Sequence, residues 1–293
     1  MGFYAPSQLV RDAQEHGVTV LPVCVQSSEW HATLETSGKS LPALRLGFEQ
    51  VHGLGETIGS RIDQARKSGL FMSVQDFTRR CHATQSQLLS LARAGALKSL
   101  AGDRRQAIWD SMERNPEPGS MPLFEAGGCL GLNEMKSGSA EIVDLPTTSP
   151  LEDVLSDYRT SGLSLVAHPL QFIRSHFVQC GIVTIAIACA QPEGSRVTVV
   201  GVVLSRQRPA TAKGIIFVTL EDETGVMNAV VPKTVWQLCD SQDRRASVLT
   251  IEGQVQRRGE VVHLLAERLA VWDESNTDES SLVGLPRMSR DFC

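Results

Sequence analysis

Alternating apolar and polar residues fill most of the sequence between Ser195 and Asp273, and this pattern constrains the fold more than any other feature. The period of two predicts strands over residues 196–205, 214–222 and 225–231, a short helix over 232–239, and strands over 247–256 and 261–271. The connection Arg257-Arg258-Gly259-Glu260 contains a glycine and predicts a hairpin between the last two strands. Three strands, a helix and two strands in about eighty residues is the order of the OB-fold, a small Greek-key barrel.

An OB-fold binds oligonucleotides with one face and its loops, so the predicted barrel supplies candidate DNA contacts. The loop between its first two strands carries Arg206, Arg208 and Lys213 and no acidic residue. Phe217, which follows this loop, is a candidate for base stacking, worth about 1–3 kcal/mol per base. Two alternatives stay open: the loop cations as a solvated surface, and Phe217 as a core residue. Arg257 and Arg258 at the final hairpin form a second candidate set.

Residues 41–115 show a different pattern, in which pairs of short amphipathic helices are joined by turns that contain glycine. Helical spacing predicts a helix on each side of Gly53-Leu54-Gly55, the second of them from Glu56 to Lys67. A second pair is predicted over residues 85–94 and 103–112, with a turn at 95–97. The sequence therefore predicts a tandem helix-hairpin-helix domain.

The turn at Gly53, Leu54 and Gly55 is a candidate phosphate site. Glycine lets the backbone come close to a phosphate, and the free N–H groups at the start of the next helix favour an anion. Arg61, Arg66 and Lys67 on that helix are candidates to extend the contact with DNA. The alternative is a simple helix–helix turn followed by a solvated basic face.

Charge is unevenly distributed along the chain. The net charge of −5 counts against nucleic-acid binding when it is taken alone. Residues 45–114, however, hold eleven Lys and Arg against seven Asp and Glu, whereas residues 117–157 hold eight acids and one lysine. The acidity therefore lies in a connecting region, and the predicted hairpin domain is basic.

Several other classes of protein are not expected. The seven cysteines include no C-x-x-C pair, and the histidines lack ligand spacing, so we expect neither a disulfide framework nor a metal site. No apolar run approaches the roughly 20 residues of a bilayer span, and the first residues do not form a secretion signal, so we expect a cytoplasmic protein without membrane contact. No D-x-D pair suited to two metal ions is present. The sequence thus offers ways to hold DNA and no evident catalytic residue.

Several motifs resemble the later part of C-family bacterial DNA polymerases, the superfamily of the polymerase III alpha subunit. They are Met1 to Ala13 (MGFYAPSQLVRDA), Leu44 to Gly47 leading to Gly53-Leu54-Gly55-Glu56, and Leu91 to Leu97 (LARAGAL). Residues 157–165 (DYRTSGLSL) with His168-Pro169, and Arg206 to Pro209 followed by residues 219–225 (TLEDETG), resemble the error-prone, damage-tolerant branch. The resemblance runs over about residues 1–272.

The residue patterns and the resemblance together predict an α+β multidomain chain, with a helical tandem helix-hairpin-helix domain followed by a β-barrel OB-fold. Residues 1–40 would be a remnant of the polymerase fingers, 41–115 the hairpin domain, 116–194 an acidic linker and helical connector, 195–273 the OB-fold and 274–293 a disordered tail. The implied function is DNA binding within a translesion DNA polymerase, with grip on the duplex backbone and on single-stranded template.

In that family, the phosphoesterase-like domain, the catalytic palm and most of the fingers precede the matching segment. We therefore expect a split or truncated product that is inactive as a polymerase alone, with the family's Mg²⁺ belonging to the palm and no cofactor in this chain. Two alternatives stay open. The chain is either half of a split nucleotidyltransferase that needs a separate catalytic chain, or an interaction module that binds partners of a mutagenic repair complex.

The resemblance also implies a contact with a sliding clamp. Related replicative polymerases carry a clamp-binding peptide after the hairpin domain that ends in an apolar residue and Phe, and Ser120-Met121-Pro122-Leu123-Phe124 occupies that place. Met121, Leu123 and Phe124 would insert into a groove of the clamp. The alternative is that Leu123 and Phe124 dock on this protein's own surface.

Overall fold

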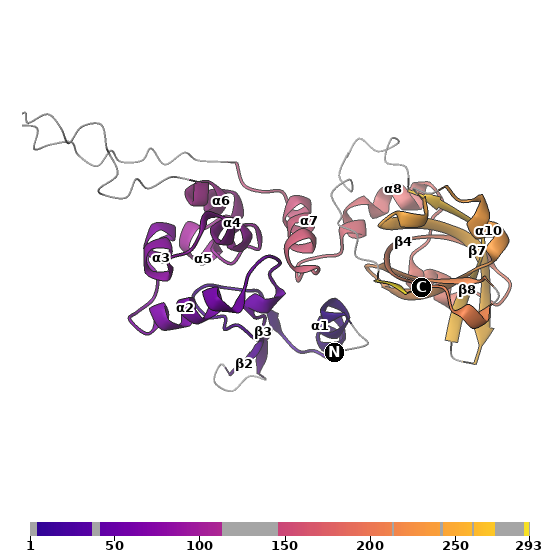
Figure 1. Ribbon diagram of the computed structural model, residues 1–293. Coiled ribbons are helices and arrows are strands. Elements are labelled where there is room, and N and C mark those ends of the chain that lie inside the picture. The colour runs from indigo at the N-terminus through magenta and orange to yellow at the C-terminus, as the bar shows by residue number, and fades with distance from the viewer. Residues whose placement is uncertain are drawn as a thin grey trace, which may run out of the picture. The chain divides into compact units, whose positions relative to one another are not determined.

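The chain folds into two compact units, Met1–Ser149 and Pro150–Cys293 (Figure 1). The computed structural model describes residues 5–36, 42–112, 146–212, 214–240, 243–259, 261–272 and 290–292.

The first unit combines a small sheet with short helices. Helix α1 (Pro6–Glu15) precedes β1 (Val20–Leu21), β2 (Thr33–Glu35) and β3 (Ala43–Arg45), which form a sheet of order β1-β3-β2. The 3-10 turn η1 (Phe48–Gln50) leads to α2 (Glu56–Arg66), α3 (Val74–Cys81), α4 (Gln85–Arg93), α5 (Lys98–Ala101) and α6 (Arg104–Met112). The pattern predicted α2, α4 and α6, and it missed α3 and the single turn α5.

Local caps explain where two of these helices begin. The Ser73 hydroxyl accepts the Asp76 N–H at 3.1 Å, and Thr84 forms a capping box with Gln87. Their apolar faces then meet in one core, whose largest fully buried side chains include Phe48, Ile58, Ile62, Phe77, Leu91 and Leu97. Helices this short depend on such packing, since isolated helices of this length are marginal in water.

The segment before the hairpins is part of the same packing. A Cβ on Gly59 of α2 would lie 2.9 Å from the Trp30 ring, so the indole lies directly against the helix backbone. The Val25 N–H donates to the Ala96 carbonyl at 3.0 Å, and the buried Ser28 hydroxyl donates to the Leu46 carbonyl at 2.7 Å. These hydrogen bonds join the segment before the hairpins to elements farther along the chain.

The second unit is built around a closed five-stranded barrel. Helix α7 (Pro150–Ser161), the 3-10 turn η2 (Pro169–Ile173), α8 (Arg174–Gln179) and α9 (Ile185–Ala190) precede β4 (Arg196–Gln207), β5 (Ile216–Asp222) and β6 (Gly225–Val231). After α10 (Lys233–Leu238) come β7 (Val248–Arg258) and β8 (Val261–Val271). The order β5-β6-β8-β7-β4 closes through an additional β4–β5 pairing. The predicted OB-fold is confirmed, with β6 and β8 at their expected bounds.

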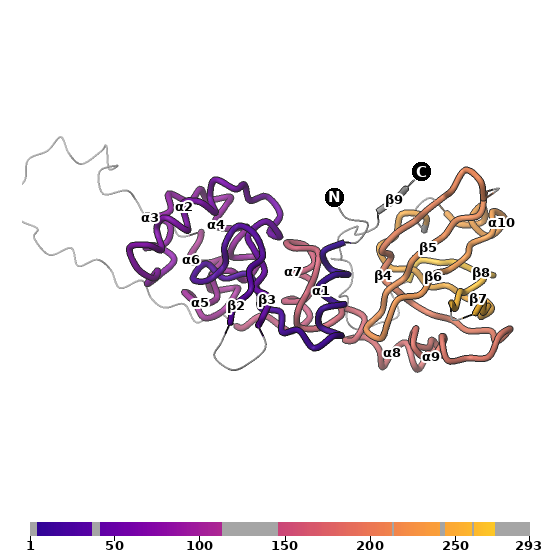
Figure 2. The backbone as a smooth tube through the Cα atoms, turned by 90° about the horizontal axis from the view of Figure 1, so that it is seen from below, coloured from indigo at the N-terminus to yellow at the C-terminus, as the bar shows by residue number. Residues whose placement is uncertain are grey.

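Alternation along the strands separates the barrel core from its outer surface. Ile216, Val218 and Leu220 of β5 are buried, while the residues between them are half-buried. The two short helices α9 and α10 pack against the barrel core through Ile185 and Trp236, among others. Figure 2 shows α8 and α9 following one another beside the barrel. Residues 290–292, inside the expected tail, form a further strand, β9, on β4.

One buried carboxylate joins the helical part of this unit to the barrel. Asp222, with 0% of its surface exposed, accepts the Ile185 N–H at 2.8 Å and the Gly225 N–H at 3.0 Å, and lies 3.3 Å from the Arg174 guanidinium. Arg174 also pairs with Glu223 through both terminal oxygens. The TLEDETG sequence therefore holds α8 and α9 onto the β5–β6 turn.

We expect Asp222→Ala to lower the free energy of unfolding of the second unit by about 3 kcal/mol, because backbone N–H groups and a buried guanidinium lose their acceptor. The midpoint of urea unfolding, followed by circular dichroism, measures this change. Glu193→Ala, at an exposed acid, is the matched control. Equal midpoints for the two variants would contradict the assignment.

Candidate nucleic-acid interface

The first hairpin has the backbone geometry that its glycines predict. Gly53 adopts a φ of 81°, which favours glycine, and Gly55 caps α2 with an ordinary φ of −110°. The Leu54 N–H donates to the Val51 carbonyl at 3.3 Å and thereby closes the turn. Gly53, Gly55 and Glu56 are all exposed.

The start of α2 is open to an anion. Among the described residues, the N–H groups of Gly55, Glu56 and Thr57 have no hydrogen-bond acceptor. A Cβ on Gly55 would lie no closer than 3.9 Å to any side chain, so the surface beside these N–H groups is free. The helix dipole favours a phosphate here, while the Glu56 carboxylate opposes one.

The three cations predicted to extend this contact differ in their surroundings. The Arg61 Nη1 donates to the His82 carbonyl at 2.7 Å, and Arg66 pairs with Asp63. The Lys67 side chain is exposed and forms no hydrogen bond or ion pair with the described residues. It lies at the far end of α2, about 18 Å from Gly55 at 1.5 Å per residue. Two of these cations therefore brace the fold, and the third lies one helix length from the hairpin.

The second hairpin, between α4 and α5, has a similar turn. Gly95 has a φ of 73°, and the Ala96 N–H donates to the Leu91 carbonyl at 2.9 Å. A Cβ on Gly95 would lie 3.2 Å from Arg104 Nη2 and 3.4 Å from Lys98 Cε, so two cations border this turn. Sequence reasoning did not name them, although the spacing R-A-G-A-L-K between Arg93 and Lys98 was visible.

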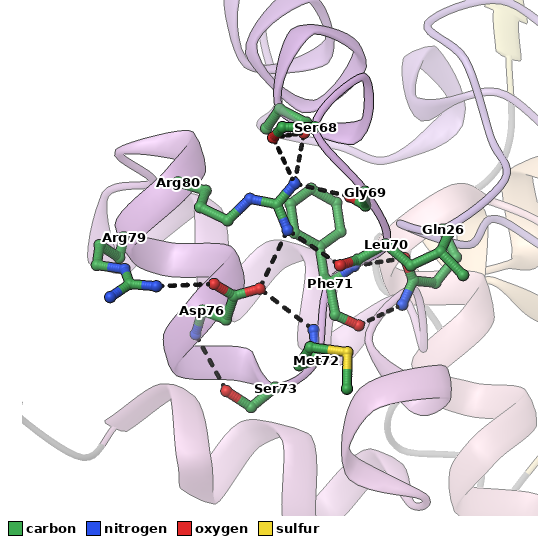
Figure 3. Close-up of polar contacts among 11 residues, drawn as sticks. Gln26, Ser68, Gly69, Leu70, Phe71, Met72, Ser73, Asp76, Arg79 and Arg80 are labelled. Carbon is green, nitrogen blue, oxygen red and sulfur yellow. Dashed lines mark hydrogen bonds and ion pairs between the residues drawn. The ribbon is translucent and has the colours of Figure 1, made fainter.

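Arg80 fixes the loop between the two hairpins (Figure 3). Its guanidinium donates to the carbonyls of Ala65, Gly69 (2.7 Å) and Leu70 (3.0 Å) and lies 4.6 Å from the centre of the Phe71 ring. Gln26 holds Phe71 from the other side through two hydrogen bonds to its backbone. The end of α2 and the start of α3 are thus set by one cation.

Asp76 completes this cluster at the start of α3. Its carboxylate accepts the Met72 N–H at 3.2 Å and pairs with Arg80 and Arg79, each at 3.1 Å. The Met72 N–H and the two guanidinium groups hold the pKa of Asp76 below its ordinary value of 3.8.

In the barrel, the outer surface of β4 and β7 is covered and that of β5, β6 and β8 is open. Val200 and Val202 on β4 and Val248 on β7 pack against Leu170 and Phe177, which belong to η2 and α8. No hydrophobic cluster of the described residues covers the opposite side. This open face is the one with which OB-folds bind oligonucleotides.

Strand register places two rows of side chains across the open face. One row is Gln207, Phe217, Val230, Leu265 and Gln254, and the other is Ser205, Thr219, Asn228, His263 and Gln256. In the second row the Ser205 and Thr219 hydroxyls are 3.0 Å apart, and the Thr219 hydroxyl lies 2.9 Å from Asn228 Oδ1. The second row carries no Lys, Arg, Asp or Glu, so it suits base edges better than phosphates.

Phe217 lies on this open face, half-buried between the inward-facing Ile216 and Val218. The alternative that Phe217 is a core residue therefore does not describe its position. Sequence reasoning missed the row from Ser205 to Gln256, because its members lie on five strands and only the register brings them together. The period-two alternation was the available signal.

The cations predicted to contact DNA from the barrel loops differ in their burial and in their hydrogen-bond partners. Arg206 is 6% exposed, lies opposite the core residue Val218 and donates to the Ala246 carbonyl. Arg257 donates to the carbonyls of Cys189 and Gln191 at the end of α9. The Arg208 and Arg258 side chains are exposed and form no hydrogen bond or ion pair with the described residues. Lys213 lies outside the described residues, as do Met121, Leu123 and Phe124 of the expected clamp peptide.

Two further observations concern other kinds of site. Across the described ranges, no group of three or more His, Cys, Asp or Glu side chains is arranged to hold a metal ion. None of the described helices has the length and apolar character required to span a bilayer.

The class of protein follows from the fold and from family models. Residues 17–107 match the model described as a helix-hairpin-helix motif, and residues 197–271 match the model of an OB-fold nucleic acid binding domain. The chain thus consists of a helical hairpin region followed by an OB-fold, and both matches indicate nucleic-acid binding.

Curated relatives of this chain are named error-prone DNA polymerases. The chain is 42% identical over 289 residues to error-prone DNA polymerase 2 of Rhizobium meliloti (strain 1021), which covers 97% of this chain and 26% of the relative. It is 40% identical over 301 residues to the error-prone DNA polymerase of Azoarcus sp. (strain BH72), covering 100% of this chain and 26% of the relative. For the error-prone DNA polymerase of Rhodopirellula baltica, the identity is 38% over 294 residues. The chain spans about a quarter of the length of the curated relatives it matches.

We expect the stability of the first unit to depend on the ionisation of Asp76. Because its folded pKa lies below 3.8, its stabilising contribution is complete above about pH 4 and is lost as the pH falls through the lowered folded pKa. Unfolding temperatures measured by calorimetry between pH 7 and pH 2.5 should therefore fall more for wild type than for Asp76→Asn. Parallel profiles would contradict this coupling.

Proposed function

We propose that this chain is the DNA-binding portion of an error-prone, damage-tolerant DNA polymerase of the C family. Its hairpins bind the backbone of duplex DNA, and its barrel binds single-stranded template. The observation that carries the proposal is the position of Phe217, on the one barrel face that the described residues leave open.

The open face of the barrel divides its aromatic and its hydrogen-bonding side chains between two neighbouring rows. Phe217 offers a flat apolar surface, and the neighbouring row from Ser205 to Gln256 offers neutral hydrogen-bonding groups. Arg208 and Arg258 stand at the β4–β5 and β7–β8 loops, at sites where OB-folds contact the strand. Stacking platforms bordered by cations are typical of proteins that bind single strands.

The first hairpin offers DNA backbone N–H groups rather than side chains. The free N–H groups at the start of α2 bind a phosphate without reading sequence, and Lys67 contacts a different phosphate farther along the duplex. Binding that is independent of sequence suits a polymerase, which acts on DNA of any sequence.

Nucleotide transfer itself belongs to segments outside this chain in our proposal, because the relatives named polymerases are about four times as long. We also propose that the chain contacts partners of a mutagenic repair complex. A sliding clamp would be contacted through Met121, Leu123 and Phe124.

We expect Phe217→Ala to weaken binding of an oligo-dT strand by about 1–3 kcal/mol, because one stacking surface is lost. Fluorescence anisotropy with a labelled oligonucleotide measures this affinity. Val166→Ala is the control, since Val166 is 72% exposed, lies outside the barrel strands and loses only part of an aliphatic side chain. Undiminished affinity in Phe217→Ala would overturn the role of the open face.

We expect Gly55→Ala to weaken binding of duplex DNA by about tenfold, because a methyl group then stands where the phosphate approaches. The φ of −110° and the 3.9 Å clearance let the fold accept alanine there. Glu56→Gln should act oppositely and tighten binding, since it removes a repelling charge. Titrations across a salt series measure both effects.

Gly225→Ala in the other unit supplies the control for the added methyl group, since its Cβ would meet Ile185 at an ordinary 3.6 Å. Duplex affinity that is equal in wild type, Gly55→Ala and Glu56→Gln would rule out the start of α2 as a phosphate site.

A further inference from the structure

Three polar side chains on the open face of the barrel form a chain of hydrogen bonds with one direction. The Ser205 hydroxyl on β4 donates to the Thr219 hydroxyl on β5 at 3.0 Å, and the Thr219 hydroxyl donates to Asn228 Oδ1 on β6 at 2.9 Å. Because a hydroxyl has a single hydrogen, Thr219 accepts on one side and donates on the other. This Ser205–Thr219–Asn228 relay therefore ends on the amide oxygen of Asn228.

The amide of Asn228 keeps its N–H groups for a ligand. The side chain is exposed, and its Nδ2 forms no hydrogen bond with any residue that the structure describes. Its Oδ1, in contrast, already accepts from Thr219. An asparagine that recognises adenine uses both halves of its amide, because it accepts from N6 and donates to N7. The relay opposes that pairing and leaves Asn228 as a donor.

Asn228 also lies close to the stacking residue of the open face. Phe217 on β5 pairs with Val230 on β6, and Thr219 pairs with Asn228, so Phe217 and Asn228 are diagonal neighbours on adjacent strands. Diagonal neighbours are about 7–8 Å apart, which is within reach of aromatic and long side chains. A base stacked on the Phe217 ring therefore places an edge near the Asn228 N–H groups.

We propose that the Ser205–Thr219–Asn228 relay makes the barrel prefer bases with exocyclic carbonyl oxygens, thymine above all, over adenine. Thymine offers two carbonyl oxygens and no amino group, whereas adenine offers an amino group and no carbonyl oxygen. Asn228 contacts the base, and Ser205 and Thr219 are positioning residues that act through it. The preference rests on the proposed binding of single strands by the open face and adds selectivity to it.

The ratio of two affinities measures this preference. Fluorescence anisotropy gives the dissociation constants of the full chain for oligo-dT and oligo-dA of equal length. Self-stacking of the free strands also affects these constants, but it is the same for every variant and cancels when the ratios of variants are compared.

Two variants should lower the preference of wild type for oligo-dT. Asn228→Asp replaces the donor by an acceptor, so the ratio should fall by about tenfold. Thr219→Val frees Oδ1 to accept from adenine, and the ratio should fall by about threefold. A role of Thr219 in folding alone would change both affinities together and leave the ratio as it was.

Two exposed residues of α10, outside the open face, supply the matched controls. Gln237→Glu makes the same change from amide to carboxylate, and Thr234→Val removes the same hydroxyl. Neither variant should change the ratio, because neither residue belongs to the rows that cross the open face.

The outcomes separate this preference from the single-strand binding on which it rests. If wild type binds both strands and Phe217→Ala weakens both, but the ratio is the same in Asn228→Asp and Gln237→Glu, the preference is wrong and single-strand binding stands. A ratio that Thr219→Val leaves unchanged would remove the relay from the proposal. If wild type binds neither strand, both proposals fail.

Discussion

The arrangement of the hairpin unit depends on the guanidinium of Arg80. Its helices have 4 to 11 residues, too few to persist alone, and each must be held at both ends. Arg80 joins the last turn of α2, the intervening loop and the carboxylate of Asp76, while its plane lies over Phe71. A planar group with five donors can satisfy several carbonyls at once, which an ammonium group cannot do in the same geometry.

The barrel unit uses the opposite charge for the same purpose. Asp222 collects backbone N–H groups from α9 and from the β5–β6 turn, with Arg174 as its cationic partner. In both units a charged side chain orders segments that carry little hydrophobic surface of their own. Many cations of the chain are therefore committed to the fold, and a count of lysines and arginines overstates the charge that is free to meet DNA.

The use of these cations in the fold explains which features the sequence could predict and which it could not. The barrel strands were predictable because alternation is local, and the glycine turns were predictable because a positive φ leaves few alternatives at Gly53 and Gly95. The partners of Arg61, Arg206 and Arg257 were not predictable, since each donates to a carbonyl 21 to 68 positions away in the sequence. Helix α3 was missed because its eight residues are mostly polar, and only Val74, Phe77 and Cys81 mark its buried face.

The packing of Trp30 against Gly59 also gives the hairpin unit an optical reporter. The indole lies in van der Waals contact with the backbone of α2, so its emission responds to separation of the N-terminal segment from the helices. Trp272 in the other unit lies edge-on to Phe177, with ring centres 4.7 Å apart. Each unit holds two of the four tryptophans, so one variant that retains only Trp30 and another that retains only Trp272 allow the unfolding of the two units to be followed separately.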